Sequence, residues 1–100
     1  MKKYIDYKQF LSQSQNADGT YTDVFQDVHV FVKVSAPSIK NVEAGITNIE
    51  SVNIYLPVKI ISKPNTQKDR IILNGETYRI NYARKVGDEW EVNMEVLYGD

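Results

Sequence analysis

The residues that could do chemistry in this 100-residue chain are one histidine, a group of carboxylates and seven tyrosines. His29 lies within an alternating strand pattern, and the sequence places no partner beside it that would make it catalytic or metal-binding. Oxygen ligands near the C-terminus could bind a hard cation, but they lack the spacing of a metal-binding loop. They are Asp88, Glu89, Glu91 and Glu95. We therefore expect a partly exposed strand histidine, a solvated acidic face and no metal site.

The sequence shows no pattern typical of other catalytic or cofactor sites. Gly75 and Gly87 stand in turn motifs rather than in a phosphate-binding loop. The strained nucleophile turn of Ser-His-Asp enzymes is not visible. The tyrosines could stack on bases or sugars, but they are scattered along the chain, which favours use in a core or an interface. We predict no catalytic residue, no cofactor and no enzymatic activity.

Composition and charge argue against further classes. Twelve basic and thirteen acidic residues give a net charge of −1, which disfavours binding of nucleic acid through its phosphates. No run approaches the roughly 20 apolar residues of a membrane span. The N-terminal lysines have no apolar segment behind them, so no signal peptide is expected. The chain has no cysteine, so it has no disulfide framework and no thiolate site, which fits a cytosolic protein. Its length predicts one domain over residues 1–100.

The elements that must position these residues are organised around the stretch Asp69–Ile80. Asn74-Gly75 is its strongest turn signal, because both residues tolerate the positive φ that a two-residue type I′ turn requires. Alternation then puts four apolar residues on one face of the hairpin. They are Ile71, Leu73, Tyr78 and Ile80. On the other face Arg70 opposes Arg79, an unfavourable pair unless an acid lies nearby.

Three further stretches alternate with a period of two. Residues 24–34 predict a strand that buries its valines, 53–62 a strand that buries isoleucine and leucine, and 90–98 a terminal strand with one apolar face. Pro57 cannot donate to a ladder, which places it at an edge or a bulge. The first eleven residues fit a helix about as well as a strand, and Asp18-Gly19 marks a turn that would join such a strand to the next one as a hairpin. The predicted apolar faces contain Val28, Val30, Val32, Val34, Ile54, Leu56, Val58, Ile60, Trp90, Val92, Met94, Val96 and Tyr98.

The segment Ile39–Val52 has a different character. Its apolar residues are close to helical spacing, and Ser38 could cap a helix, but Gly45 and several β-branched residues lower the helix propensity. We interpret it as a long excursion that can include a helical turn. Loops beyond about 12 residues are uncommon in compact domains without a functional reason. This segment is therefore the strongest candidate for a functional element.

The predicted fold class is mainly β, a small antiparallel barrel of five to six strands. Hairpin connections without strand–helix–strand alternation favour an antiparallel sheet. A closed or nearly closed barrel buries the valine, hairpin and tryptophan faces together. A long loop, or a short helix, is expected between the second and third strands.

The ordered features resemble the head–tail joining proteins of tailed bacteriophages, also called head-closure, stopper or head–tail connector proteins. The likeness spans roughly residues 15–98 and centres on the D-R-I…G…Y-x-I pattern of the hairpin. The residues that carry it are Asp18, Gly19, Ala36, Pro37, Asp69, Arg70, Ile71, Asn74, Gly75, Tyr78 and Ile80. The chain departs from the family in lacking a clear basic N-terminal strand. Phe25 or Phe31 stands where members often carry an aromatic residue.

The resemblance implies a structural protein of the virion. Members form a homo-oligomeric ring below the portal that extends and closes the DNA channel and presents a surface for the tail. The implied partners are the portal or an adaptor protein, and the tail or a tail-completion protein. The implied location is the head–tail interface of the virion, after assembly in the host cytoplasm. The loop 36–51 would point toward the channel, with the contact residues Ile39, Val42, Gly45, Ile46 and Ile49.

The isolated subunit is expected to be a monomer that binds no membrane and no specific nucleic-acid sequence. Its loop would expose apolar residues that await a partner, whereas Asn74 and Gly75 are expected to have a structural role. The alternative interpretation is a small OB-like barrel that binds single-stranded nucleic acid or a sugar through tyrosines. The near-neutral charge weighs against nucleic acid.

Overall fold

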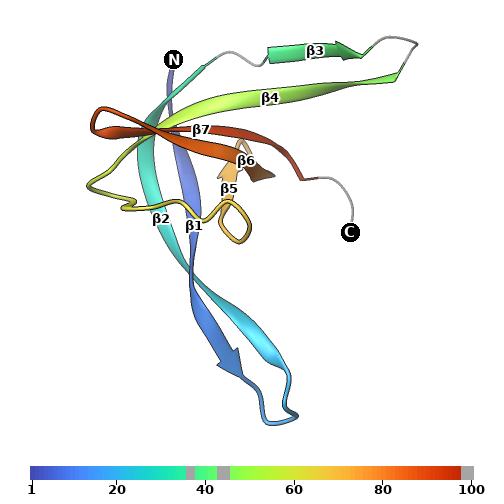
Figure 1. Ribbon diagram of the computed structural model, residues 1–100, viewed down its shortest axis with the longest axis vertical. Helices are drawn as coiled ribbons and strands as arrows, with labels where there is room; N and C mark the ends of the chain where they lie inside the picture. Colours follow the sequence, from blue (N-terminus) through green and yellow to red (C-terminus); the bar gives the residue numbers. More distant parts are fainter. Residues whose placement is uncertain (36–37, 43–45, 98–100) are drawn as a thin grey trace.

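The computed structural model describes residues 1–35, 38–42 and 46–97, and every regular element in those residues is a strand (Figure 1). The strands are β1 (Lys2–Gln15), β2 (Tyr21–Val34), β3 (Ser38–Val42), β4 (Ile46–Pro57), β5 (Arg70–Leu73), β6 (Glu76–Val86) and β7 (Glu89–Val96). Within the described residues, no helix is long and apolar enough to span a membrane.

Six of the strands close into an antiparallel barrel. The sheet runs in the order β2-β1-β5-β6-β7-β4-β3, and a further pairing of β2 with β4 joins it into a ring of strands. That closing contact is short, with Lys33 opposite Tyr55 and Val34 opposite Ile54. In the described part of the chain, β3 pairs with β4 alone and lies outside the barrel. The predicted fold class is confirmed.

The barrel interior is filled by the alternating apolar faces that the sequence predicted. The valines of β2, the β5–β6 hairpin and the apolar face of β7 meet there, with Val28, Tyr78 and Trp90 partly buried at the margin. The buried apolar residues are Ile5, Tyr7, Val30, Val32, Val34, Val52, Ile54, Leu56, Ile61, Ile71, Leu73, Ile80, Val92 and Met94. Removing such surface from water stabilises the fold by roughly 25 cal/mol per Å². Tyr98, predicted on the same face, lies outside the described residues.

The turn between β5 and β6 fixes the register of the hairpin. Leu73 pairs with Glu76, and φ is +53° at Asn74 and +78° at Gly75. Both central residues are therefore left-handed, as a type I′ turn requires. This register buries alternate residues of β5 and leaves the residues between them on the outside.

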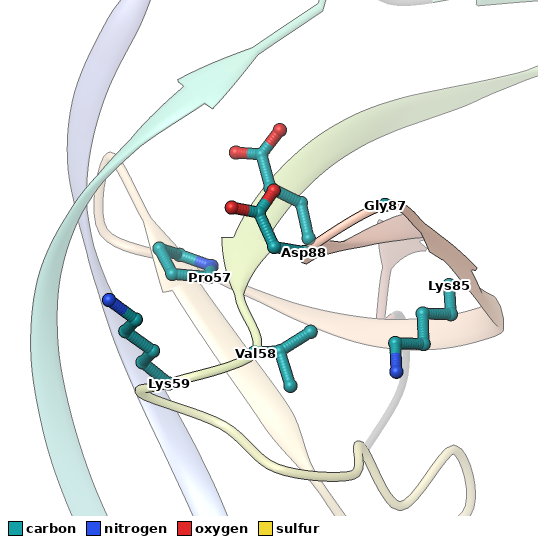
Figure 2. A pocket seen from close by; sticks show the side chains of 7 residues that line it. Pro57, Val58, Lys59, Lys85, Gly87 and Asp88 are labelled. Atoms are coloured by element: carbon teal, nitrogen blue, oxygen red, sulfur yellow. The ribbon is translucent and has the colours of Figure 1, made fainter.

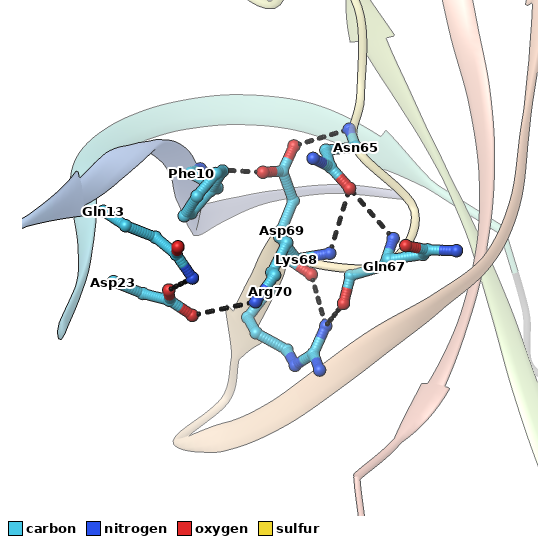
Figure 3. A network of polar contacts seen from close by, with 8 residues as sticks. All are labelled: Phe10, Gln13, Asp23, Asn65, Gln67, Lys68, Asp69 and Arg70. Carbon is cyan, nitrogen blue, oxygen red and sulfur yellow. Dashed lines mark hydrogen bonds and ion pairs between the residues drawn. The ribbon is translucent and has the colours of Figure 1, made fainter. Parts of the chain in front are cut away.

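The predicted pair of opposed arginines on this hairpin forms, and each guanidinium has its own acceptor. Arg70 lies opposite Arg79. Arg79 donates to the Glu95 carboxylate at 2.7 Å. Arg70 donates to the backbone carbonyls of Gln67 at 3.1 Å and Asp69 at 2.9 Å (Figure 3). The like charges are therefore directed to different partners.

The end of β4 differs from the prediction. The strand ends at Pro57 and does not continue through 58–62. The N–H groups of Ile60 and Ile61 turn back to the Pro57 carbonyl, at 3.0 and 3.2 Å. The predicted alternation is therefore wrong beyond Pro57: Val58 lies outside the strand, and Ile60 is 43% exposed while Ile61 is buried. Proline has no N–H to continue a ladder, so the chain leaves the sheet here.

Two segments whose conformation the sequence left open are strands. The first eleven residues belong to β1. The excursion 36–51 carries β3 and the first part of β4, which pair antiparallel from Ser38 opposite Ser51 to Val42 opposite Ile46. The expected loop is thus a projecting β-hairpin, and its described part contains no helical turn. Its β-branched residues pack well in strands and lose side-chain freedom in helices.

A buried carboxylate fastens the connector 58–69 to the barrel (Figure 3). Asp69 is 1% exposed. It accepts hydrogen bonds from the Tyr7 hydroxyl at 2.5 Å, the Phe10 N–H at 2.7 Å and the Asn65 N–H at 2.8 Å. Burial, and then the bond to Asp69, raise the pKa of Tyr7, so its hydroxyl stays protonated and donates. The network joins β1 to the connector where β1 leaves the barrel.

Candidate assembly surfaces

The first surface is a two-stranded arm, residues 10–25, formed by the outer halves of β1 and β2 (Figure 1). In the described part of the chain, β1 meets β5 only at residues 6–8 and β2 meets β4 only at 33–34. Beyond those positions β1 and β2 pair with each other. Every residue from 11 to 22 is exposed. The molecule has a radius of gyration of 15.1 Å, against about 13 Å for a compact chain of this length.

The tip of the β1–β2 arm is held by several hydrogen bonds. Asn16 N–H donates to the Thr20 carbonyl at 2.7 Å, and Gly19 N–H donates to the Asn16 carbonyl at 3.0 Å. The Asp18 carboxylate accepts from the Thr20 N–H and hydroxyl, at 3.0 and 2.6 Å. These bonds lower the pKa of Asp18, so the carboxylate is ionised at neutral pH. The Asn16 amide also donates to the hydroxyls of Thr20 and Thr22. The tip is therefore a preorganised polar turn that carries one negative charge.

The outer face of β1 and β2 carries directly opposed side chains nearer the barrel. Tyr4 lies opposite Phe31, and Asp6 opposite His29. The Tyr4 ring stacks on His29 with centroids 4.9 Å apart and contacts the Phe31 ring at 4.7 Å. His29 Nδ1 lies 2.7 Å from Asp6 Oδ1, and the His29 side chain is 64% exposed. The sequence predicted this exposure but not the aromatic contact.

Exposed apolar side chains gather on β1 and β2. Six of the eleven large apolar side chains that are exposed in the described residues belong to these two strands. They are Tyr4, Leu11, Tyr21, Val24, Phe25 and Phe31. A two-stranded ribbon is marginally stable in water without an apolar cover, and an exposed apolar patch marks a surface for a partner.

The second surface is the β3–β4 arm, which contains four of the five contact residues that the resemblance implied. Ile39 and Val42 lie in β3, and Ile46 and Ile49 lie in β4. Val42 pairs with Ile46 across the hairpin. Gly45 lies outside the described residues. The structure thus brings these positions together in one hairpin that projects from the barrel (Figure 1).

The third surface, the outer face of β4, β7 and β6, satisfies its polar groups internally. Arg84 lies 2.6 Å from Glu91, and Arg79 lies 2.7 Å from Glu95. Three asparagines form a chain of hydrogen bonds across the same strands, with distances of 2.9 and 2.7 Å. They are Asn81, Asn93 and Asn53. Most polar side chains of this face are therefore paired with one another within the subunit.

The predicted acidic face divides into two parts. Asp88 and Glu89 are exposed at the β6–β7 turn, as expected. For Glu91 and Glu95 the expectation of a solvated face is wrong, because their side chains are only 13% and 17% exposed and lie in the ion pairs described above. Burial, and then the Glu91 charge, raise the pKa of the Tyr55 hydroxyl beside it. In the described residues, no group of three or more His, Asp or Glu side chains is placed to hold a metal.

Two open hollows lie along the connector. The first, of about 450 Å³, lies where the connector leaves β4, beside the β6–β7 turn (Figure 2). It is lined by Pro57, Val58, Lys59, Lys85, Gly87, Asp88 and Glu89. The second, of about 480 Å³, lies at the foot of the β1–β2 arm. It is lined by Phe10, Lys63, Pro64, Asn65, Thr66 and Gln67.

Sequence reasoning indicated the hairpin at Asp18-Gly19, but it missed the projection of that hairpin from the barrel, and it missed the buried Asp69. The projection of the β1–β2 arm had a signal in the sequence, namely the length of the segment and its polar run 12–16 before the Asp18-Gly19 turn. A strand without alternating apolar residues has no apolar face to bury in a core, so it is expected to extend into solvent. The buried Asp69 had no such signal, because its partners Tyr7 and Phe10 lie about 60 residues away in the chain.

No family model matches the chain, and no curated protein matches it. A chain in the solved structure described as the virion of the native gene transfer agent particle has the same fold, with a TM-score of 0.56 and 11% sequence identity. The match covers 94% of this chain and 91% of that chain. It therefore takes in most of both arms as well as the barrel.

Proposed function

We propose that this chain is a structural virion protein of a tailed phage, a head–tail connector or head-closure protein that forms a ring below the portal. The observation that carries the proposal is the near full-length likeness, arms included, to a chain of a virion particle. The two hairpins project from the barrel of the single subunit, and copies in a ring can join through them. The role is structural and involves no catalysis.

In this proposal the β3–β4 arm is the channel element. Copies of the arm converge on the ring axis and close a passage that one hairpin could not block. The residues that meet there are Ile39, Val42, Gly45, Ile46 and Ile49. Ordering a free segment costs roughly 1–2 kcal/mol per residue in backbone entropy. The pairing of β3 with β4 in the single subunit meets part of that cost before assembly.

The two ends of the ring have different partners. One end contacts the portal or an adaptor protein, and the other contacts the tail or a tail-completion protein. The protein is then located at the head–tail interface of the virion, after assembly in the host cytoplasm.

A second candidate function is an OB-like module that binds single-stranded nucleic acid or a sugar. The exposed stack of Tyr4, His29 and Phe31 favours it, because bases and sugars pack on aromatic faces. The carboxylate of Asp6 beside the stack disfavours a phosphate backbone.

Co-expression with the portal protein of the same genome tests the first proposal. We expect the two proteins to co-purify and electron microscopy to show an added ring below the portal. A variant with Ile39–Asn48 replaced by a Gly-Ser linker should keep the barrel and still join the ring, but particles that carry it should leak DNA or fail to hold tails. Absence of binding to the portal, an adaptor and a tail-completion protein of that genome would overturn the proposal.

A further inference from the structure

We infer that the tip of the β1–β2 arm docks into the hollow at the foot of the same arm in a second copy of this chain, so that copies join head to tail. The inference rests on the proposed function, since it supplies the contact between neighbours in the ring. The tip is the turn 16–20, and the hollow is the one lined by Phe10 and residues 63–67.

The tip is an acidic docking element with no cation of its own. Residues 9–32 contain three aspartates and no lysine or arginine. Asp23 is paired with Lys68 at 3.2 Å, and Asp27 is paired with Lys8 at 3.2 Å. Among the described residues, Asp18 has hydrogen bonds to Thr20 but no ion pair. It stands at the end of the arm as an exposed negative charge.

The hollow is a basic acceptor of matching polarity. The connector 58–69 contains three basic residues and one acid, and that acid, Asp69, is buried. Lys68 is already engaged by Asp23. Lys63 lines the hollow, is exposed, and has no ion-pair partner within the described part of the chain. Within the described residues, the tip has one carboxylate without an ion pair, and the polar lining of the hollow has one ammonium without an ion pair.

The tip cannot reach the hollow of its own subunit. It lies seven or eight residues beyond Phe10, which at strand rise places it roughly 25 Å from the foot of the arm. The turn is held by its own hydrogen bonds, so docking costs little ordering entropy. A contact between two different patches on identical chains is heterologous, and such contacts build rings when the rotation closes.

Disulfide trapping tests the inference directly, because the chain has no native cysteine. Ala17→Cys places a thiol at the tip, and Thr66→Cys places one in the hollow. Neither replaced side chain makes a described hydrogen bond or ion pair. Both variants retain the charged residues Asp18 and Lys63. The double variant, oxidised at high concentration, should give a ladder of dimers, trimers and closed rings. Each single variant should give little product, and a mixture of the two should stop at the dimer.

Charge reversal gives the matched control. Lys63→Glu in the double-cysteine background should slow cross-linking roughly fivefold, and added salt should weaken the wild-type reaction. Lys85→Glu, the same change at the other hollow, should leave the rate unchanged.

Equal effects of the two reversals, rapid dimerisation of Ala17→Cys alone, or no ladder from the double variant would each overturn the inference. Portal binding without a ladder would refute the docking while the proposed function stands. A ladder without binding to the portal, an adaptor or a tail-completion protein would refute the proposed function while the docking stands.

Discussion

The outer face of β1 and β2 and the outer face of β4, β7 and β6 belong to one barrel but leave different groups unsatisfied. On β4, β7 and β6, arginines meet glutamates and asparagines bond to one another across the strands. On β1 and β2, the rings of Tyr4, Phe25 and Phe31 are exposed, and half of the ribbon extends beyond the barrel. The polar side chains on β4, β7 and β6 are paired within the subunit, whereas β1 and β2 expose aromatic rings, and exposed apolar surface of this kind marks a surface for a partner.

The contrast also separates stability from assembly. The barrel draws its stability from the buried core and from the network of Asp69 at the point where β1 leaves it. The ribbon beyond that point adds little to folding. Changes in the barrel should therefore alter unfolding, and changes on the ribbon should alter association.

The largest effect is expected at the boundary between the two regions. Asp69→Ala should lower the free energy of unfolding by about 3 kcal/mol, because it leaves the Tyr7 hydroxyl and the Phe10 and Asn65 N–H groups without their acceptor. Urea denaturation measures the change. Asp88→Ala, at an exposed turn, is the control and should stay within about 0.5 kcal/mol. A loss below about 1 kcal/mol for Asp69→Ala would show that the network does not hold the connector.

The next effect concerns association. The double variant Tyr4→Ser/Phe31→Ser should weaken ring formation on the portal at least tenfold, about 1.4 kcal/mol, while its unfolding midpoint stays close to wild type because both rings are exposed. Tyr82→Ser removes an exposed tyrosine from β6 and should leave assembly unchanged. Equal losses of ring formation in the two variants would contradict the claim that association depends on the face of β1 and β2 rather than on the face of β4, β7 and β6.

A smaller effect is expected in alkali. The pKa of Tyr7 is raised in the fold above its ordinary 10.0 by burial and by Asp69. The stabilisation from the protonated hydroxyl is therefore complete below pH 10.0 and is lost as the pH rises above that value. Denaturation series from neutral pH to pH 11 should show a steeper loss for wild type than for Tyr7→Phe, which has no proton to lose. Parallel curves would mean that the hydroxyl is not held as described.

The smallest expected effect is on nucleic acid. The isolated protein should show negligible affinity for single- or double-stranded DNA at physiological salt, since its net charge is −1 and the carboxylate of Asp6 lies beside the aromatic stack. Fluorescence anisotropy with labelled oligonucleotides measures this. Micromolar binding with a steep salt dependence would instead favour the OB-like module.

The parts of the barrel that depend on local sequence signals were predicted correctly. The parts that depend on contacts between residues distant in the sequence were not. Asn74-Gly75 fixed the β5–β6 register because its requirement for positive φ is local. The valine alternation of β2 gave the core face for the same reason. The 36–51 segment was predicted as a loop or helix, because isoleucines at near-helical spacing do not show that a partner strand lies opposite them. The burial of Asp69 could not be predicted, because two of its partners, Tyr7 and Phe10, come from β1.

Hydrogen exchange on the free subunit and on the portal-bound ring tests the central claim most directly. The account predicts that amides of both arms, residues 10–25 and 38–51, gain protection on assembly. Amides of β7, which pair with strands on both sides in the single subunit, should exchange equally in the two states. Unchanged exchange in both arms, or new protection confined to β7 and its neighbours, would contradict the assignment of the arms as the assembly surfaces.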